Sequence, residues 1–125
     1  MAKTREGYVL EAVLGWLEHS GFEHWRVPLS PIVRGGGKTK VSFSANPMRG
    51  FPDIVVISRS RPGTLYGFEL KAPAQKTMFK SLPAGRVEKH QKDWHKRLIS
   101  AGCKVAVVYS LDEFVSKLRE FEQSW

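Results

Sequence analysis

The chain has 125 residues, of which 42% are hydrophobic and 26% charged, with 20 lysines and arginines against 12 aspartates and glutamates. This length suits a single domain with its own core, spanning residues 1–125, and excludes two. The composition excludes a disordered chain, and no apolar run reaches the ~20 residues that a membrane span needs. The first residues lack the apolar core of a signal peptide, so we expect a cytoplasmic protein with no membrane partner. The net charge of +8 favours a polyanionic partner.

Hydrophobic residues near the N-terminus recur every three to four positions, as Val9, Val13 and Leu17 illustrate. This spacing predicts an amphipathic helix over residues 5–20, which Gly21 ends. The next segments are predicted as an edge strand over 25–33, a glycine-rich loop over 34–40, a short strand over 41–44 and a turn over 46–50.

The second half begins with residues 53–58, which are apolar on both faces and therefore predict a strand inside the sheet. A turn at residues 61–63 leads to a second strand over 65–71, so the two strands form a hairpin. The remaining segments are predicted as a loop over 72–85, a helix over 86–101, a strand over 104–110 and a helix over 111–121. The predicted order is α-β-β-β-α-β-α, an α/β sandwich with a mixed central sheet, because the last β-α-β unit requires a parallel pair.

Two polar residues project onto helix faces that are otherwise apolar. Glu6 lies on the stripe of the first helix, either as a first-turn partner of the helix dipole or as a site residue. Gln91 lies on the apolar face of the helix over 86–101, either as an amide bonded to the main chain or in a functional role. Both interpretations stay open for each residue.

The strand over 65–71 places Glu69 and Lys71 on one face, because side chains alternate along a strand. Asp53 opens the partner strand of the hairpin, so the two carboxylates converge. Two carboxylates at this distance repel each other unless a cation lies between them, and hard oxygen ligands select Mg²⁺ or Mn²⁺. Such an ion activates water toward a phosphodiester, and a nearby lysine can orient that water.

Gly50-Phe51-Pro52-Asp53 followed by Glu69-Leu70-Lys71 resembles the PD-(D/E)xK motif of the restriction-endonuclease-like phosphodiesterases. The Gly-x-Pro-Asp sequence, the glutamine on the next helix, the apolar strand and the closing Ser-x-Asp-Glu segment are similar to the VRR-NUC domain family over about residues 5–120. Stand-alone members occur in phages and bacteria. The resemblance implies a restriction-endonuclease-like three-layer sandwich and a metal-dependent DNA endonuclease, located in the cytoplasm of a bacterium or a phage-infected cell.

The resemblance also implies individual roles. Asp53, Glu69 and the main-chain carbonyl of Leu70 are the expected metal ligands, and Glu6 completes the ligand shell, directly or through water. Lys71 is the expected catalytic lysine, and Gln91 the motif glutamine. Small members of the family resemble homodimeric resolvases, which implies a homodimer acting on branched DNA such as a four-way junction. The stretch over 76–85 is longer than the family pattern.

Residues 76–97 hold seven basic and two acidic residues, a local net charge of +5. Phosphate contacts from such a surface explain DNA binding without catalysis, so a noncatalytic DNA-binding module remains the alternative, as does a nuclease acting on flaps, nicks or linear duplex. Gly37-Lys38-Thr39 imitates a P-loop, but Ile32 replaces the required glycine, which excludes a nucleotide cofactor. The four histidines form no metal-binding pair and are interpreted as structural. The expected DNA contacts are Arg34, Lys38, Lys40, Arg49, Lys76, Lys80, Arg86 and Lys89.

Overall fold

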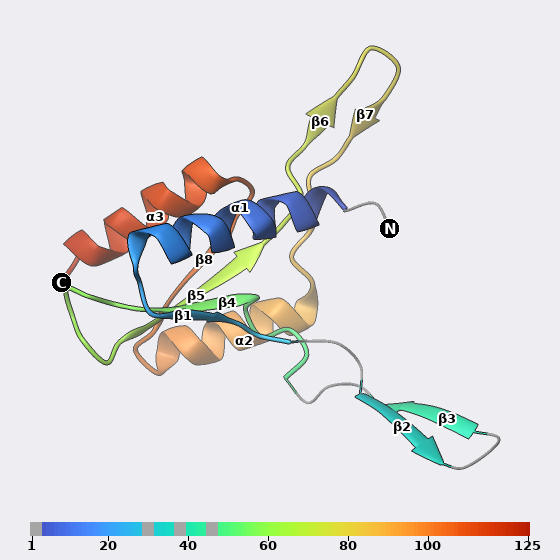
Figure 1. Ribbon diagram of the computed structural model, residues 1–125, viewed down its shortest axis with the longest axis horizontal. Helices are drawn as coiled ribbons and strands as arrows, with labels where there is room; N and C mark the ends of the chain where they lie inside the picture. The colour runs from blue at the N-terminus through green and yellow to red at the C-terminus, as the bar shows by residue number, and fades with distance from the viewer. Residues whose placement is uncertain (1–3, 29–31, 37–39, 45–47) are drawn as a thin grey trace.

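The computed structural model describes residues 4–28, 32–36, 40–44 and 48–125, and it describes side chains over 4–28 and 48–125. Three helices and eight strands follow one another in this part of the chain (Figure 1). They are α1 (Arg5–Ser20), β1 (His24–Arg26), β2 (Ile32–Gly36), β3 (Lys40–Ser44), β4 (Ile54–Ile57), β5 (Leu65–Leu70), β6 (Gln75–Lys76), β7 (Ser81–Leu82), α2 (Lys89–Ser100), β8 (Lys104–Val108) and α3 (Leu111–Gln123).

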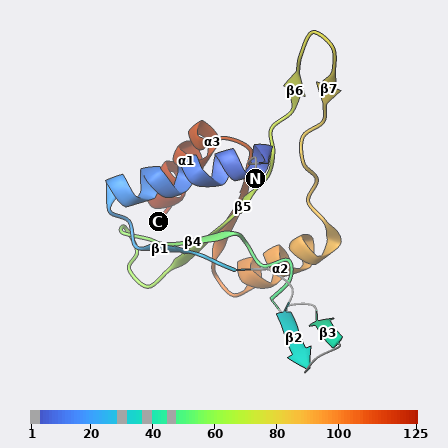
Figure 2. The ribbon, with the colours of Figure 1, turned by 45° about the vertical axis from the view of Figure 1, so that its right-hand side comes forward.

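The main sheet has four strands in the order β1-β4-β5-β8. The first two pairs are antiparallel and β5 pairs with β8 in parallel, so the predicted mixed sheet and the β4–β5 hairpin are confirmed. Helices α1 and α3 lie together on one face of this sheet and α2 lies on the other (Figures 1 and 2). The arrangement is an α/β sandwich in which β4 and β5 are the inner strands, as the apolar sequence of residues 53–58 predicts.

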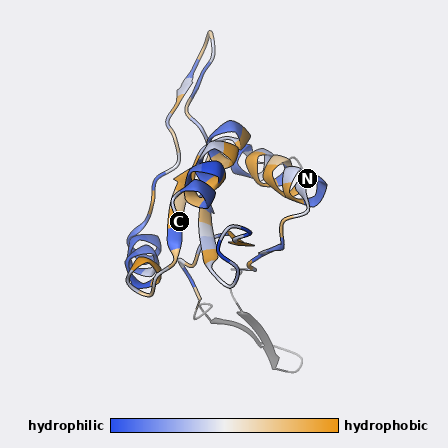
Figure 3. Cartoon of the chain, turned by 90° about the vertical axis from the view of Figure 1, so that its left-hand side faces the viewer, coloured by the Kyte–Doolittle hydropathy of each residue, from blue (hydrophilic) through white to orange (hydrophobic). Residues whose placement is uncertain are grey.

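The main core lies between the sheet and the α1–α3 pair. Strand β5 alternates its side chains between two environments, as a strand must. Tyr66, Phe68 and Leu70 are fully buried in the core with Phe114 of α3. The hydrophobic colour in Figure 3 accordingly concentrates on the sheet and on the inner sides of α1 and α3. The odd-numbered residues of β5 therefore face α2, and this is the side on which Glu69 and Lys71 lie.

The helix termini follow from local sequence. The side chain of Thr4 accepts a hydrogen bond from the backbone N–H of Gly7 and so caps the start of α1. Gly21 ends that helix at φ 76°, a conformation that glycine adopts without strain. Ser110 caps α3 in the same way as Thr4 caps α1. Within the described residues, none of the helices has the length and apolar character that crossing a bilayer demands.

The segment before β4 differs from the prediction of one long edge strand over 25–33. Only His24–Arg26 pairs with the main sheet, and Ile32–Gly36 belongs instead to a separate hairpin with Lys40–Ser44. Pro28 lies between the two pieces, and a proline cannot donate to a ladder, so the strand stops there. The predicted loop over 34–40 was therefore wrong at its ends, which lie in β2 and β3.

The segment over 72–85, predicted as a loop, carries the short hairpin β6–β7. Its turn closes because the backbone N–H of Thr77 donates to the carbonyl of Lys80, while the backbone N–H of Lys80 donates to Thr77 Oγ1. The helix predicted from residue 86 begins at Lys89, since Glu88 occupies the N-cap in an extended conformation. The observed order thus contains more strands than α-β-β-β-α-β-α, although the helices and the last β-α-β-α order agree.

Candidate metal and phosphodiester site

The register of the β4–β5 hairpin brings the two predicted carboxylates together. Ile54 pairs with Phe68, so the preceding residue, Asp53, lies across from Glu69 on the face turned toward α2. Asp53 Oδ2 accepts a hydrogen bond of 2.7 Å from the backbone N–H of Leu70. This bond fixes the Asp53 side chain over the end of β5, where the main-chain ladder of the hairpin runs out.

The segment before Asp53 is held against both the sheet and α2. A Cβ atom added to Gly67 would lie 2.8 Å from Cγ of Pro52, so the absence of a side chain at Gly67 lets Pro52 lie directly on β5. Phe51 packs edge-on against Trp94 of α2, with ring centroids 5.1 Å apart. Pro52 and Phe51 therefore determine where the chain enters β4 and, with it, the position of Asp53.

Glu69 is the most unusual side chain of the site. It is 1% exposed, and in its ionised form neither of its carboxylate oxygens has a hydrogen-bond partner among the described residues. Burial raises the pKa of Glu69 to about 10, assisted by a hydrogen bond that the protonated group shares with Asp53 and by the Asp53 charge, which together outweigh the lowering by Lys71. Without a bound metal ion, this carboxyl group keeps its proton at neutral pH despite the charge of Lys71.

Lys71 follows on the same face and is only 9% exposed. Its positive charge acts on Glu69, on Glu6 and on His95, so it belongs to the same electrostatic group. Glu6, in the first turn of α1, is half-buried, and burial followed by the Asp53 charge raises its pKa. Both interpretations of Glu6 are therefore compatible with its position, because it lies at the helix N-terminus and also feels the site.

A pocket of about 310 Å³ opens at this end of the sheet. It is bounded by the first turn of α1, the end of β1 and the start of β4, and Glu6, Asp53 and Leu70 all line it. A larger hollow of about 740 Å³ lies along α3 near Trp16. Glu69 and Lys71 line neither pocket, but the smaller one contains their neighbour Asp53, whereas the larger one contains none of the predicted site residues. We therefore assign the chemistry to the smaller pocket.

Gln91 has a structural partner of its own. Its Oε1 atom accepts a hydrogen bond of 2.8 Å from the backbone N–H of Glu88 and so caps the start of α2. This contact is the amide-to-main-chain bond that the helical pattern offered as one of two interpretations. A role of Gln91 in bracing the site remains a prediction.

Two functional candidates escaped the sequence reasoning. His95 Nε2 lies 3.4 Å from Glu69 Oε1, yet burial and the charge of Lys71 lower the pKa of His95, so the imidazole is neutral and does not balance the acid. The sequence pattern could have indicated His95, because this residue follows Gln91 by one helical turn and lies on the same face of the helix. Arg26 lines the pocket from the edge strand β1. Its position depends on the pairing of Arg26 with Ile54, which no local pattern reveals.

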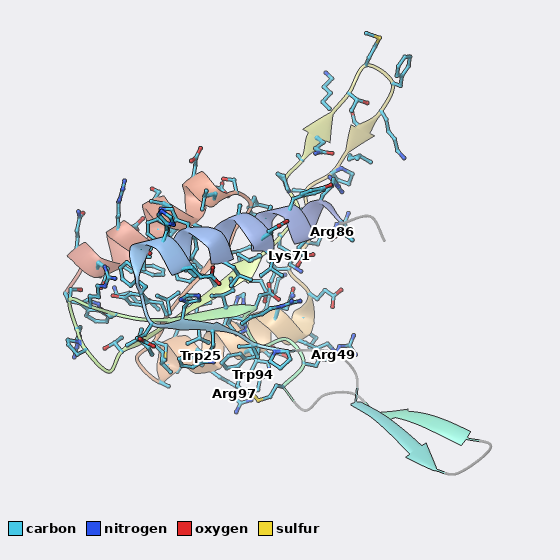
Figure 4. The ribbon with its side chains drawn as sticks, in the orientation of Figure 1. Trp25, Arg49, Lys71, Arg86, Trp94 and Arg97 are labelled. Atoms are coloured by element: carbon cyan, nitrogen blue, oxygen red, sulfur yellow. The ribbon has the colours of Figure 1, made fainter. Side chains whose placement is uncertain are left out.

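Two of the expected DNA contacts can be placed relative to Lys71. In Figure 4, Arg49 and Arg86 lie toward the same end as Lys71, where β5 finishes and α2 begins. The side chains of Arg49, Lys76, Lys80, Arg86 and Lys89 are all exposed. Lys38 lies outside the described residues, as do the side chains of Arg34 and Lys40, whose backbones belong to β2 and β3.

The donor set fits a hard divalent cation that keeps much of its own water. Across the residues with described side chains, no three His, Cys, Asp or Glu groups converge closely enough to enclose a metal ion. Mg²⁺ is commonly held by only one or two protein carboxylates, with water and substrate phosphate supplying the remaining ligands. The unpartnered oxygens of Glu69 beside Asp53 match that pattern, whereas a zinc site would need three or four protein ligands.

Comparison with known proteins adds no family to this geometry. No protein-family model, curated protein or solved structure matches the chain.

Proposed function

We propose that this protein is a Mg²⁺- or Mn²⁺-dependent DNA endonuclease with a restriction-endonuclease-like fold, of the stand-alone VRR-NUC type. One observation carries the proposal: the buried Glu69 carboxyl group lies next to a second acid, Asp53, and no cationic side chain of the described residues donates a hydrogen bond to either Glu69 oxygen. A carboxylate in that environment needs a cation, because burying it unpaired costs several kcal/mol.

The chain's own residues supply binding and orientation. Asp53 and Glu69 would hold the ion, with the carbonyl of Leu70 and the Glu6 carboxylate at its rim. The bound ion neutralises a phosphate oxygen and lowers the pKa of water. Lys71 donates a hydrogen bond to the attacking water or to the developing oxyanion, and its near-complete burial makes that charge effective. Arg26, which lines the pocket from β1, would offer a second positive group to the phosphate.

The substrate is inferred to be branched DNA. Exposed basic residues such as Arg49 and Arg86 lie toward the same end of the molecule as Lys71, and phosphate contacts of this kind bind DNA without reading its sequence. A selective nuclease of this size then recognises the shape of its substrate. Cutting two strands across a four-way junction requires two sites, and the described part of the chain brings Asp53, Glu69 and Lys71 together once, so the active form is inferred to be a homodimer.

The deciding experiment is a cleavage panel on four-way junctions, flaps, splayed arms, nicked duplex and linear duplex, with Mg²⁺ or Mn²⁺. We expect cleavage of branched DNA that chelator stops. Asp53→Asn and Glu69→Gln should lose cleavage while retaining DNA binding, and Asp112→Asn, in the first turn of α3, is the matched control that should remain active.

Cleavage that continues in excess chelator, or in both site variants, would overturn the proposal. Binding to all these DNAs without cleavage in either metal would instead favour the noncatalytic DNA-binding module.

A further inference from the structure

The β6–β7 hairpin leaves the body of the domain beside the pocket and ends in two large apolar side chains. Figures 1 and 2 both show it projecting beyond the N-terminal end of α1. At its tip Met78 is 90% exposed and Phe79 is 92% exposed, whereas most large apolar side chains of the described residues are at least partly covered. Full exposure of two such groups at the end of an arm indicates a contact made with something outside this chain.

The base of the arm is fixed to the site. Arg5 Nη1 donates hydrogen bonds of 2.9 Å to the carbonyl of Pro73 and of 3.4 Å to the carbonyl of Pro83, joining both strands of the arm to the start of α1. The backbone N–H of Gly85 donates to the carbonyl of Ala72 and closes the base. The arm is therefore a clamped element of the domain and not a free loop.

The same clamp places the arm next to Lys71. A Cβ atom on Gly85 would lie 3.3 Å from Cδ of Lys71, so the returning strand passes directly over the lysine side chain. The position of the tip is thereby tied to that of the proposed reacting group.

The charge of the arm identifies its partner. Between Glu69 and Glu88 the chain has no aspartate or glutamate, while Lys76 and Lys80 flank the apolar tip. Positive charge on both sides of a protruding phenylalanine and methionine complements a polyanion that also offers apolar surface. Stacked bases between phosphate backbones have this combination of properties.

We propose that Met78 and Phe79 insert as a wedge between bases of the bound DNA while Lys76 and Lys80 contact the adjoining phosphates. This inference rests on the proposed function and names how that site would select branched DNA. Inserted apolar side chains unstack a base step and kink the duplex, and the energetic cost is lowest where bases are already unpaired or stacking is interrupted. A wedge thus favours junctions and other branch points over continuous duplex.

The dimensions agree with that role. From Ala72 to Met78 the arm can extend by roughly 20 Å, at about 3.3 Å per residue. That length corresponds to about six base-pair steps of ~3.4 Å. The wedge would therefore act within about six base pairs of the bond that is cut.

The test places 2-aminopurine, whose fluorescence rises when it is unstacked, at successive positions of a four-way junction. Binding is measured in chelator with the Asp53→Asn chain, so the readout does not depend on cleavage. We expect fluorescence to rise at one or two positions near the branch point, and the rise to disappear with Met78→Ser plus Phe79→Ser. Phe79→Trp should retain it. The polar tip should also weaken junction binding by roughly 5- to 150-fold, with a much smaller effect on linear duplex.

Lysine variants provide the matched control. Lys76→Gln plus Lys80→Gln should weaken binding to all DNAs alike and reduce the salt dependence of affinity by about two phosphate contacts. The polar-tip variant should leave that salt dependence unchanged. A polar tip that lowers affinity for junction and duplex equally, with no change in fluorescence, would overturn the wedge.

Other binding partners of the Met78–Phe79 tip would give different results. If the polar tip converts a dimer into a monomer in sedimentation, the arm grips a second copy of the chain and the wedge is wrong. If it abolishes co-sedimentation with anionic phospholipid vesicles and leaves junction binding intact, the wedge is also wrong. Metal-dependent cleavage without any unstacking signal rejects the wedge and keeps the nuclease, whereas an unstacking signal without cleavage keeps the wedge and rejects the nuclease.

Discussion

Gly50 lies directly against the backbone of His90, so closely that a Cβ atom on Gly50 would fall 2.5 Å from the His90 carbonyl carbon and oxygen. Gly50 also has φ +91°, a conformation that side chains other than hydrogen rarely allow. The contact docks the segment leading to Asp53 on the first turn of α2. The glycine of the Gly-x-Pro-Asp sequence is thus needed for packing before any chemistry is considered.

Gly50→Ala should therefore lower the free energy of unfolding by about 2–4 kcal/mol, because strain and a backbone clash act together. Denaturant unfolding measures this loss. Gly15→Ala is the matched control: Gly15 is exposed inside α1 with nothing within 4 Å of an added Cβ. That variant should gain about 0.5–1 kcal/mol from helix propensity. Equal effects of the two substitutions would contradict the packing role of Gly50.

Glu69→Gln should make the protein more stable and inactive at the same time. The folded pKa of about 10 lies above the unfolded value near 4.5, so the native state binds the extra proton between these values. Stability of the wild type therefore falls as pH rises from about 5 toward 10, and glutamine removes that loss. We expect unfolding in chelator at about pH 8 to show a gain of at least about 1 kcal/mol for the variant, with little difference near pH 5.

Added Mg²⁺ should make the wild type more stable than Glu69→Gln, the reverse of the order expected in chelator. An ion that binds only the folded wild type raises its melting temperature, while Glu69→Gln, which offers no carboxylate, should respond much less. The measurement is thermal unfolding across a metal titration at fixed pH. A wild-type protein that neither gains stability from Mg²⁺ nor loses it with rising pH would contradict the cation site.

Much of this arrangement was predictable, because it depends on local periodicity. The helix over 5–20, the hairpin that joins Asp53 to Glu69 and the closing helix follow from spacing and from turn residues, and the structure confirms them. The pairing of the two acids needed only the hairpin and the two-residue period of a strand.

What could not be predicted depends on contacts between segments distant in the sequence. The β6–β7 arm has only four strand residues between two prolines, too few for a periodic signal, and its base is held by Arg5 from the far end of the chain. Arg26 lines the pocket because the pairing of β1 with β4 places it opposite Ile54. Gln91 stood out for its polarity, yet its visible contact is a helix cap, which shows that a polar intruder does not by itself specify a role.

Lys71→Met should lower the cleavage rate by about 100-fold or more. The fold should be kept, since methionine retains most of the buried side-chain stem. The loss should appear in kcat and not in DNA affinity, because the charge acts on the reacting atoms. Lys96→Met, an exposed lysine of α2, is the matched control and should stay active. Single-turnover cleavage beside an equilibrium binding assay separates the two effects, and equal activity of both variants would remove Lys71 from the mechanism.

Glu122 should control stability in acid, far from the site. Burial alone would raise its pKa, but hydrogen bonds from Ser58, Ser60, Tyr66 and the backbone of Arg59 outweigh burial and lower the pKa to about 2. Because the folded value lies below the unfolded value near 4.5, this contribution is complete above about pH 4.5 and is lost as pH falls toward 2.

Glu122→Gln should accordingly destabilise the protein at neutral pH by about 1 kcal/mol, a value reduced by solvent screening of this partly exposed group. The difference from wild type should shrink below about pH 4 in thermal melts, because the wild-type carboxylate then becomes protonated. Glu120→Gln breaks only an exposed ion pair with Lys117 and should leave the melting curve nearly unchanged. A Glu122→Gln effect that persists undiminished in acid would show that the carboxylate charge is not what ties the end of α3 to the β4–β5 turn.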